Sequence, residues 1–145
     1  MYNNIIVCVV YRVRYTETEN LFKKDSKKMK LYKRTWAEID LDNLKHNFEI
    51  YRAQIPENTE IMCVVKAFAY GHSDSIVVPY LQEKLGVKWF AVSNLAEAIR
   101  MRKKGITGEI LILGYTSPDE ASELEEFNII QAVMTADYAR QLSVK

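Results

Sequence analysis

EIMCVV (residues 60–65), KWFAVS (residues 88–93) and EILIL (residues 109–113) are three short, nearly continuous apolar runs. Runs of this length are typical of strands that are buried on both faces of a parallel sheet. The stretches between them, residues 74–84 and 95–104, have helix-forming composition, and each stops close to a glycine. Strand and helix therefore alternate, and right-handed βαβ crossovers join such strands into a parallel sheet.

The same alternation extends from this stretch in both directions. Downstream, SPDE (residues 117–120) predicts a helix start with a capping serine, a first-turn proline and two acids. IIQAVM (residues 129–134) then predicts a fourth buried strand, and residues 136–142 begin one more helix. Upstream, TWAEIDL (residues 35–41) alternates as a half-buried strand does, and a helix with one apolar face follows and ends at Pro56.

Two α/β architectures are built from such units. One is a doubly wound open sheet, and the other is a (β/α)₈ barrel, which needs about 250 residues. The four units that start at residue 60 would make half of a barrel. The chain has 145 residues and stops as another helix begins, so on length alone we expect it to be part of a longer protein.

The composition is that of an ordinary globular protein, with 48% apolar and 27% charged residues, and it excludes disorder and collagen-like structure. The formal net charge of +1 provides no field for nucleic acid or for an anionic membrane, so neither is expected as a partner. Cys8 and Cys63 lie far apart in the sequence and match neither a metal spacing nor a disulfide framework. A reducing, cytoplasmic setting fits this composition best.

Residues 1–32 are expected to form a poorly ordered N-terminal extension, and the regular pattern begins at residue 33. The apolar run at residues 5–11 is much shorter than the roughly 20 residues that span a bilayer, and no basic residue precedes it. It is therefore not a convincing signal peptide. Residues 23–34 hold seven basic residues against one acid, which is typical of a solvated linker.

Lys66 directly follows the first buried strand, at the strand end where a parallel sheet gathers its reactive groups. The next residues, AFAYGH (residues 67–72), predict a loop with an aromatic hydroxyl at Tyr70 and a glycine that permits a tight turn. A lysine held against an apolar strand end can act as a nucleophile toward carbonyl groups and form a Schiff base. From position alone, the alternative is a lysine whose stem lies on the strand and whose ammonium reaches water.

KAFAYGH (residues 66–72), preceded by CVV (residues 63–65), resembles the pyridoxal-phosphate lysine motif of alanine racemases, V-V-K-A-[D/N]-A-Y-G-H-G. Three further blocks resemble the same family in the same order. They are WAEIDL (residues 36–41) with Leu44, His46 and Asn47, FAVS (residues 90–93) with Glu97, Ala98 and Arg102, and ILILG (residues 110–114). The resemblance extends from about residue 33 to the C-terminus.

The resemblance implies a (β/α)₈ barrel that binds pyridoxal 5'-phosphate, a separate C-terminal β domain, and a homodimer. Residues 33–145 would be the first part of this barrel, with about four βα units, and the C-terminal β domain would be absent. Lys66 would bind the cofactor covalently and act as one of two acid/base groups on the substrate α-carbon. Tyr70 would place its hydroxyl on the cofactor phosphate. The second base would be a tyrosine of the partner subunit's C-terminal domain, so these 145 residues are expected to be inactive alone.

The implied activity is the interconversion of L-alanine and D-alanine, an isomerase reaction that supplies cell-wall precursors. A serine or broad-specificity racemase is an alternative, because the family builds its substrate pocket mainly from residues outside this chain. A second alternative is a non-catalytic, single-barrel protein that carries pyridoxal phosphate, against which Tyr70, Gly71 and His72 argue. A third is a truncated, non-catalytic chain with exposed sheet edges.

Phe68 and Ser73 depart from the family motif, because Asp or Asn is usual at the first position and glycine at the second. Phe68 would either add bulk beside Lys66 and weaken cofactor binding or point outward. The remaining candidates have structural interpretations: a loop role for His72, a surface or capping contact for His46, and a core position for Cys63. The acidic group at residues 119–126 is interpreted as a solvated helix face, and no metal site is expected.

Overall fold

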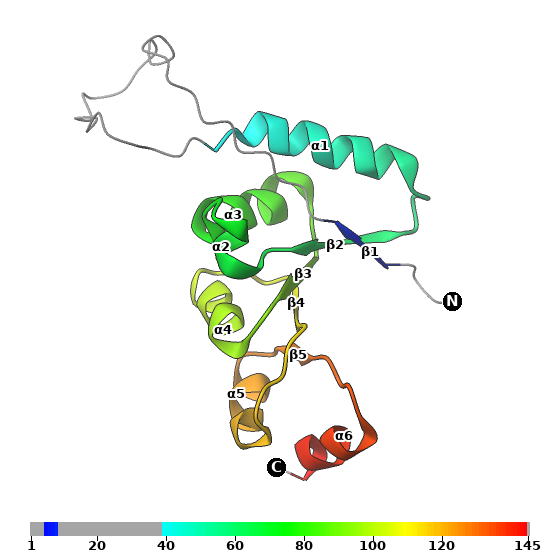
Figure 1. The fold of residues 1–145 in the computed structure, drawn as a ribbon. Coiled ribbons are helices and arrows are strands. Elements are labelled where there is room, and N and C mark those ends of the chain that lie inside the picture. The colour runs from blue at the N-terminus through cyan, green and yellow to red at the C-terminus, as the bar shows by residue number, and fades with distance from the viewer. Residues whose placement is uncertain (1–4, 9–38, 145) are drawn as a thin grey trace, which may run out of the picture.

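The computed structural model describes residues 5–8 and 39–144. Strands and helices alternate along most of this part of the chain (Figure 1). The strands are β1 (Ile5–Cys8), β2 (Glu60–Val64), β3 (Trp89–Val92), β4 (Glu109–Ile112) and β5 (Ile130–Gln131). The helical elements are α1 (Leu41–Gln54), α2 (Lys66–Tyr70), α3 (Asp74–Leu85), α4 (Leu95–Lys103), the 3₁₀ turn η1 (Pro118–Glu120), α5 (Ala121–Glu126) and α6 (Ala136–Ser143).

The described strands form one sheet in the order β1-β2-β3-β4-β5, and every neighbouring pair is parallel. Helices α3, α4 and α5 lie along one side of this sheet (Figure 1). Alternate strand residues such as Cys63, Phe90 and Ile110 belong to the main core, which contains the buried residues of these helices. The opposite strand face forms a small separate cluster around Met62 and Val64, without helix residues.

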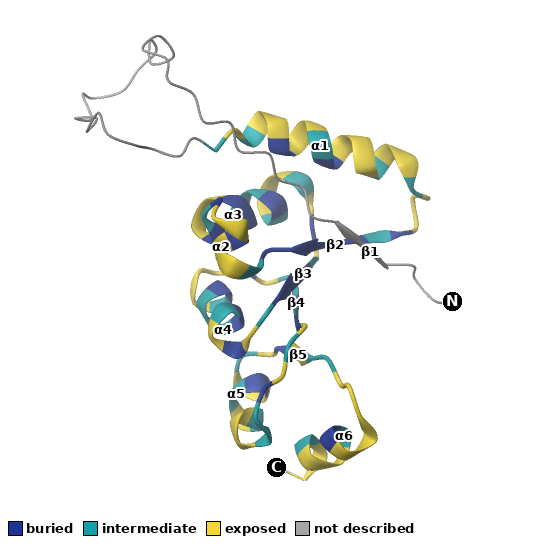
Figure 2. Cartoon of the chain, in the orientation of Figure 1, coloured by how far each residue is buried: buried dark blue, intermediate teal, exposed yellow. Residues whose placement is uncertain are grey.

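This one-sided arrangement decides between the two architectures that the sequence left open. A doubly wound sheet has helices on both faces, whereas a (β/α)₈ barrel has them only on the outside. Strands that follow chain order, with a strand-only cluster on the inner face, have the geometry of part of such a barrel. Figure 2 shows buried residues on the strands and on helix faces that point toward them. The predicted α/β fold and partial barrel are therefore confirmed.

Short polar caps explain where the helices begin. The side chain of Asp40 accepts a hydrogen bond from the Asn43 backbone N–H at 2.9 Å, and Asn94 accepts one from the Glu97 N–H at 3.0 Å. Ser117 and Glu120 form the capping box of η1. These caps confirm the helix starts that were predicted after residues 94 and 117.

Arg102 on α4 ties together the loops that precede β4 and β5. Its guanidinium donates to the backbone carbonyls of Ile106 (2.8 Å), Gly108 (2.6 Å), Phe127 (2.9 Å) and Asn128 (2.7 Å). Burial lowers the pKa of this guanidinium, and the carboxylate of Glu109 partly offsets the effect. One side chain thus fixes the loops at the amino ends of two strands.

Two predicted strands differ in the structure. The strand expected at residues 35–41 does not reach Leu41, because the Asp40 cap starts α1 there; residues 35–38 lie outside the described residues. The strand expected at residues 129–134 is reduced to Ile130–Gln131. Here the Gln131 side-chain amide donates to the Gly114 carbonyl at 2.7 Å, in place of a backbone N–H of a longer β5.

Strand β1 was not predicted. Its residues belong to the short apolar run that we assigned to the N-terminal extension, yet they pair with β2 from Ile5 opposite Glu60 to Cys8 opposite Cys63. The rest of the expected extension lies outside the described residues. In the described part of the chain, no helix is long and apolar enough to cross a membrane.

Candidate active site

The carboxyl ends of four neighbouring strands meet at one edge of the sheet. Backbone hydrogen bonds continue the ladders past the strands, from Val65 N–H to Ala91 (2.8 Å), from Leu113 N–H to Val92 (2.9 Å) and from Ala132 N–H to Ile112 (3.0 Å). Lys66 follows β2 at this edge. In barrels of this type, the active site is built at this end of the strands.

The backbone adopts a left-handed conformation immediately after Lys66. Residues Ala67, Phe68, Ala69 and Tyr70 have φ between 52° and 55°, so that α2 is a left-handed turn. Its backbone remains hydrogen-bonded, with Ala69 N–H donating to Val65 at 3.0 Å. Each non-glycine residue in this conformation costs roughly 1–2 kcal/mol. The sequence predicted a loop here with a glycine that permits a tight turn, but nothing in the residue types indicated that residues 67–70 would be left-handed.

Lys66 and Tyr70 stand at the two ends of this turn. The side chain of Lys66 is half-buried, and Tyr70 is 40% exposed. Gly71 then takes a φ of 84°, a conformation that glycine adopts without strain, and its N–H donates to the Ala67 carbonyl at 3.1 Å. The structure therefore brings the two predicted site residues onto one short element.

His72 is buried beneath the turn. Its Nδ1 lies 2.9 Å from the Ala69 carbonyl oxygen, and its backbone N–H donates to the same carbonyl at 3.1 Å. This contact supports the structural loop role that the sequence suggested. Ser73 follows with a φ of 67°, at the position where the family motif usually has glycine.

Glu97, in the first turn of α4, connects this turn to the end of β3. One carboxylate oxygen accepts a hydrogen bond from the Ala67 N–H at 2.8 Å. The other accepts from both the N–H and the hydroxyl of Ser93, each at 2.8 Å. Burial alone raises the pKa of Glu97, but the hydrogen bonds from Ser93 and Ala67 outweigh it and hold the pKa below its ordinary value. The carboxylate thus stays charged and fixes the peptide next to Lys66.

Sequence reasoning matched Glu97 to a family block and assigned it no role. Glu97 contacts Ala67, which is 30 positions away in the sequence, and Ser93, which is 4 positions away. The periodicity of the α4 sequence does not predict these contacts. The signal in the sequence was an acid three residues after the Asn94 cap.

The ring of Phe68 is in contact with Arg100 of α4. The guanidinium carbon of Arg100 lies 4.6 Å from the ring centroid, and the side chain of Phe68 remains 59% exposed. This exposure favours the outward one of the two orientations that the sequence left open.

Asp74, the first residue of α3, holds Arg100 in this position. Its carboxylate accepts from Arg100 Nε at 2.9 Å and from Lys104 Nζ at 2.8 Å, and the residue is 4% exposed. Burial raises the pKa of Asp74, but the hydrogen bonds and charges of Lys104 and Arg100 outweigh it, so the pKa lies below its ordinary value.

Gly114 lets the loop after β4 approach the loop after β3. A Cβ atom at this position would overlap the backbone carbonyl oxygen of Ser93. Since Ser93 is also a partner of Glu97, this close approach ties the ends of β3 and β4 to the Lys66 turn.

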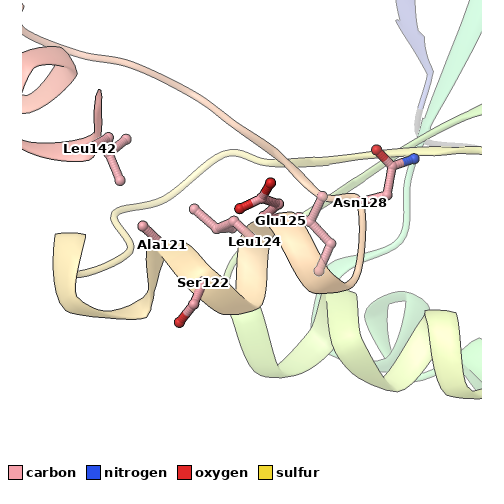
Figure 3. A pocket seen from close by; sticks show the side chains of 7 residues that line it. Ala121, Ser122, Leu124, Glu125, Asn128 and Leu142 are labelled. Atoms are coloured by element: carbon pink, nitrogen blue, oxygen red, sulfur yellow. The ribbon is translucent and has the colours of Figure 1, made fainter. Parts of the chain in front are cut away.

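The other candidates are distributed between the surface and the core. His46 and the acids Glu120, Glu125 and Glu126 are exposed, and Cys63 is buried in the core. Within residues 5–8 and 39–144, no group of three or more His, Cys, Asp or Glu side chains could hold a metal ion. A hollow of about 430 Å³ lies between α5 and Leu142 of α6, and it contains none of the predicted site residues (Figure 3).

Comparison with known proteins agrees with this geometry. The family described as "Alanine racemase, N-terminal domain" matches residues 39–145. An amino-acid racemase of Enterococcus faecalis is 40% identical over 114 residues, which is 79% of this chain and 16% of that protein. An alanine racemase of Geobacter sp. (strain M21) is 44% identical over 108 residues, 74% of this chain and 28% of that protein.

A solved structure of alanine racemase from Clostridium difficile 630 superimposes with a TM-score of 0.72 at 37% identity, and the match covers 79% of this chain and 30% of that one. This chain therefore spans less than a third of the length of the relatives that it matches. The family match covers most of the sequence, and the arrangement of parallel strands and helices agrees with it. The chain belongs to the alanine racemase N-terminal domain family.

Proposed function

We propose that this chain supplies the cofactor-binding lysine of a pyridoxal-phosphate-dependent racemase that interconverts L-alanine and D-alanine. The observation that carries the proposal is the left-handed turn after β2, with an amine at its start and a phenol at its end. Backbone strain of this kind clusters at active sites and ligand clamps. Membership of the family supports the same assignment.

The side chains at this turn fit pyridoxal phosphate. The primary amine of Lys66 is the group that reacts with an aldehyde, and the phenolic hydroxyl of Tyr70 can donate a hydrogen bond to a phosphate. Both side chains reach solvent, so a ligand can approach them. The Glu97 carboxylate holds the peptide between Ala67 and Lys66, which keeps the amine at the strand end.

When bound, pyridoxal phosphate withdraws electrons from the α-carbon of an attached amino acid and makes its proton removable. Lys66 Nζ would take or return this proton on one face, and the Tyr70 hydroxyl would orient the phosphate. Inversion needs an opposed group on the other face. The family resemblance assigns that group to a tyrosine of a partner subunit, so we expect a homodimer in the whole protein and no turnover by these 145 residues alone.

The remaining assignments follow from the same resemblance. Residues 33–145 would belong to the cofactor barrel and residues 1–32 to an N-terminal extension. The product D-alanine would serve cell-wall synthesis in the cytoplasm. A broader amino-acid racemase is the second candidate, because the relative from Enterococcus faecalis carries the name amino-acid racemase.

Borohydride reduction in the presence of pyridoxal phosphate tests the role of Lys66. We expect a covalent pyridoxyl label on Lys66, located by peptide mass spectrometry, and its loss in Lys66→Ala. Lys88→Ala is the matched control, because Lys88 precedes β3 at the opposite end of the sheet and is largely exposed. A label on another lysine, with Lys66 unmodified, would contradict the proposal.

Tyr70→Phe tests the phosphate contact. One hydrogen bond to a charged acceptor contributes about 1.5–3 kcal/mol, so the half-saturating cofactor concentration should rise roughly ten- to a hundredfold. Labelling of Lys66 should return at high pyridoxal phosphate. Tyr51→Phe is the control, because Tyr51 on α1 has a similar exposure, 46% against 40% for Tyr70. Equal effects of the two substitutions would exclude the assigned role of Tyr70.

A further inference from the structure

The centre of the left-handed turn needs a restraint that its ends do not provide. Glu97 holds Ala67 at the start of the turn, and His72 contacts Ala69 from below. Phe68 lies between these two anchors, at a φ of 55°, with most of its surface exposed. A strained backbone of this kind persists only where its surroundings fix it.

Arg100 provides a contact to the centre of the turn. Its guanidinium lies over the ring of Phe68, with 4.6 Å from the guanidinium carbon to the ring centroid. This distance is within the range in which the ring quadrupole attracts a cation. The contact joins α4 to α2 across 32 residues of sequence, and α2, α3 and α4 lie next to one another (Figure 1).

Asp74 keeps Arg100 from moving away. Its buried carboxylate accepts from Arg100 Nε through one oxygen and from Lys104 Nζ through the other. Lys104 also donates to the hydroxyl of Ser75 at 2.5 Å. A guanidinium that is held on one edge by a buried acid has fewer accessible rotamers, so the position of its face over Phe68 is defined.

The contacts among Phe68, Arg100 and Asp74 connect the segments on both sides of the site residues. Phe68 lies two residues after Lys66 and two before Tyr70, and Asp74 opens the helix that follows the turn. Phe68, Arg100 and Asp74 therefore connect the middle of the turn to the start of α3 through α4. Phe68, at the position where the family motif usually has Asp or Asn, thus has a contact partner in Arg100 on α4.

We propose that Arg100 is a positioning residue, which lies over the Phe68 ring, is fixed by Asp74, and holds the turn that presents Lys66 and Tyr70. For the effect on the cofactor, this inference rests on the function proposed above. Arg100 does not need to touch the cofactor, because it acts through the backbone on both sides of Phe68.

A double-mutant cycle on this chain tests the contact, with Arg100→Met, Phe68→Leu and the double variant. Two readouts are used. The first is amide hydrogen exchange at Ala69, Gly71 and His72 without cofactor, and the second is the pyridoxal phosphate concentration that half-saturates borohydride labelling at Lys66. A partly exposed cation–π pair predicts a two- to fivefold faster exchange and a two- to fivefold higher half-saturating concentration, by rough estimate. Because each single variant already removes the contact, the double variant should change little further.

Two variants act as controls. Phe68→Tyr keeps an aromatic face and should leave both readouts at the unmodified level. Lys103→Met removes the other cation that α4 places near a ring, 5.9 Å from the centroid of Phe127, and should also leave both unchanged. Far-ultraviolet circular dichroism identifies any variant that fails to fold. If Arg100→Met fails to fold, the comparison of Phe68→Leu with Phe68→Tyr tests the contact.

Additive effects of Arg100→Met and Phe68→Leu would overturn the inference, as would equal losses in Phe68→Leu and Phe68→Tyr. Faster exchange without any change in labelling would also overturn it, because the role would then be confined to the fold. If the unmodified chain is not labelled at Lys66 at all, the proposed function fails. Hydrogen exchange then decides by itself whether Arg100 holds the turn.

Discussion

Glu97→Gln should destabilise the protein well beyond the loss of an ordinary helix-terminal charge. The carboxylate accepts from two backbone N–H groups and one hydroxyl, whereas glutamine has a single carbonyl oxygen. The NH₂ group of the glutamine would then face either the Ala67 N–H or the Ser93 N–H, and two hydrogen-bond donors cannot pair with each other. The loss of one hydrogen bond to a charged group, at a partly buried site, costs about 1.5–2 kcal/mol.

The position of Glu97 in the first turn of α4 adds a smaller contribution. A negative charge there interacts with the helix dipole by about 0.3–1 kcal/mol. The two contributions together give about 2–3 kcal/mol. For a chain of this size, the expected drop in melting temperature is about 5–10 °C.

The effect should depend on pH with a defined sign. The pKa of Glu97 in the folded chain lies below its ordinary value of 4.5, so the unfolded chain binds the proton more readily. The stabilisation is therefore complete above the ordinary pKa and is lost as the pH falls through the folded-state pKa. The difference in the free energy of unfolding between the unmodified chain and Glu97→Gln should be largest at neutral pH and should decrease at acidic pH.

Urea unfolding at neutral pH and at about pH 3, followed by circular dichroism, measures both effects. Glu123→Gln is the matched control, because Glu123 also lies in a first helical turn, that of α5, and accepts from the Ser122 hydroxyl. The control should lose no more than about 1 kcal/mol. Equal losses in the two variants, or a Glu97→Gln loss that does not change with pH, would refute the role assigned to the Glu97 bridge.

Three further substitutions test other parts of the site by the same unfolding measurement. Gly114→Ala should destabilise by about 1–3 kcal/mol, because the new Cβ overlaps the Ser93 carbonyl and the overlapping atom is backbone; an unchanged midpoint would show that the loop after β4 moves freely. Ser73→Gly should stabilise by up to about 1 kcal/mol, because glycine adopts the φ of 67° without strain; a loss of stability would contradict this. Asp74→Asn should cost about 2–3 kcal/mol, less than the roughly 3–5 kcal/mol of a fully buried ion pair, because Arg100 and Lys104 are about a third exposed; a Lys45→Gln control, from an exposed pair with Glu49, should change stability by less than about 1 kcal/mol.

Local signals in the sequence were sufficient to predict the repeating part of the fold. The apolar runs at residues 60–65, 88–93 and 109–113 became β2, β3 and β4 with shifts of one residue at their ends. A strand that is buried on both faces is apolar at nearly every position, and this pattern can be recognised within each segment alone. The end of α4 was also predictable, because basic residues and Gly105 mark it, and Gly105 has a φ of 83°.

Pairing between strands that are far apart in the sequence could not be predicted from local patterns. The run that contains β1 was too short for a membrane span and was assigned to the extension, but its partner strand lies more than 50 residues away. The hand of α2 was also not predictable, because Ala-Phe-Ala-Tyr has no glycine that would indicate positive φ. Lys66 and Tyr70 were identified from position and resemblance, whereas the residues that hold them were not.

The anchors of the Lys66 turn come largely from the next βα unit. Glu97 and Arg100 both lie on α4, and Asn94 caps the same helix beside Ser93 at the end of β3. The position of α4 depends in turn on the burial of Ala98 and Met101 in the core. A left-handed turn of four non-glycine residues is unfavourable without such support, so the segment KAFAYGH does not carry its conformation by itself. It follows that the presentation of Lys66 depends on the packing of β3 and α4, and that a core substitution at Met101 would reach the site through Glu97 and Arg100.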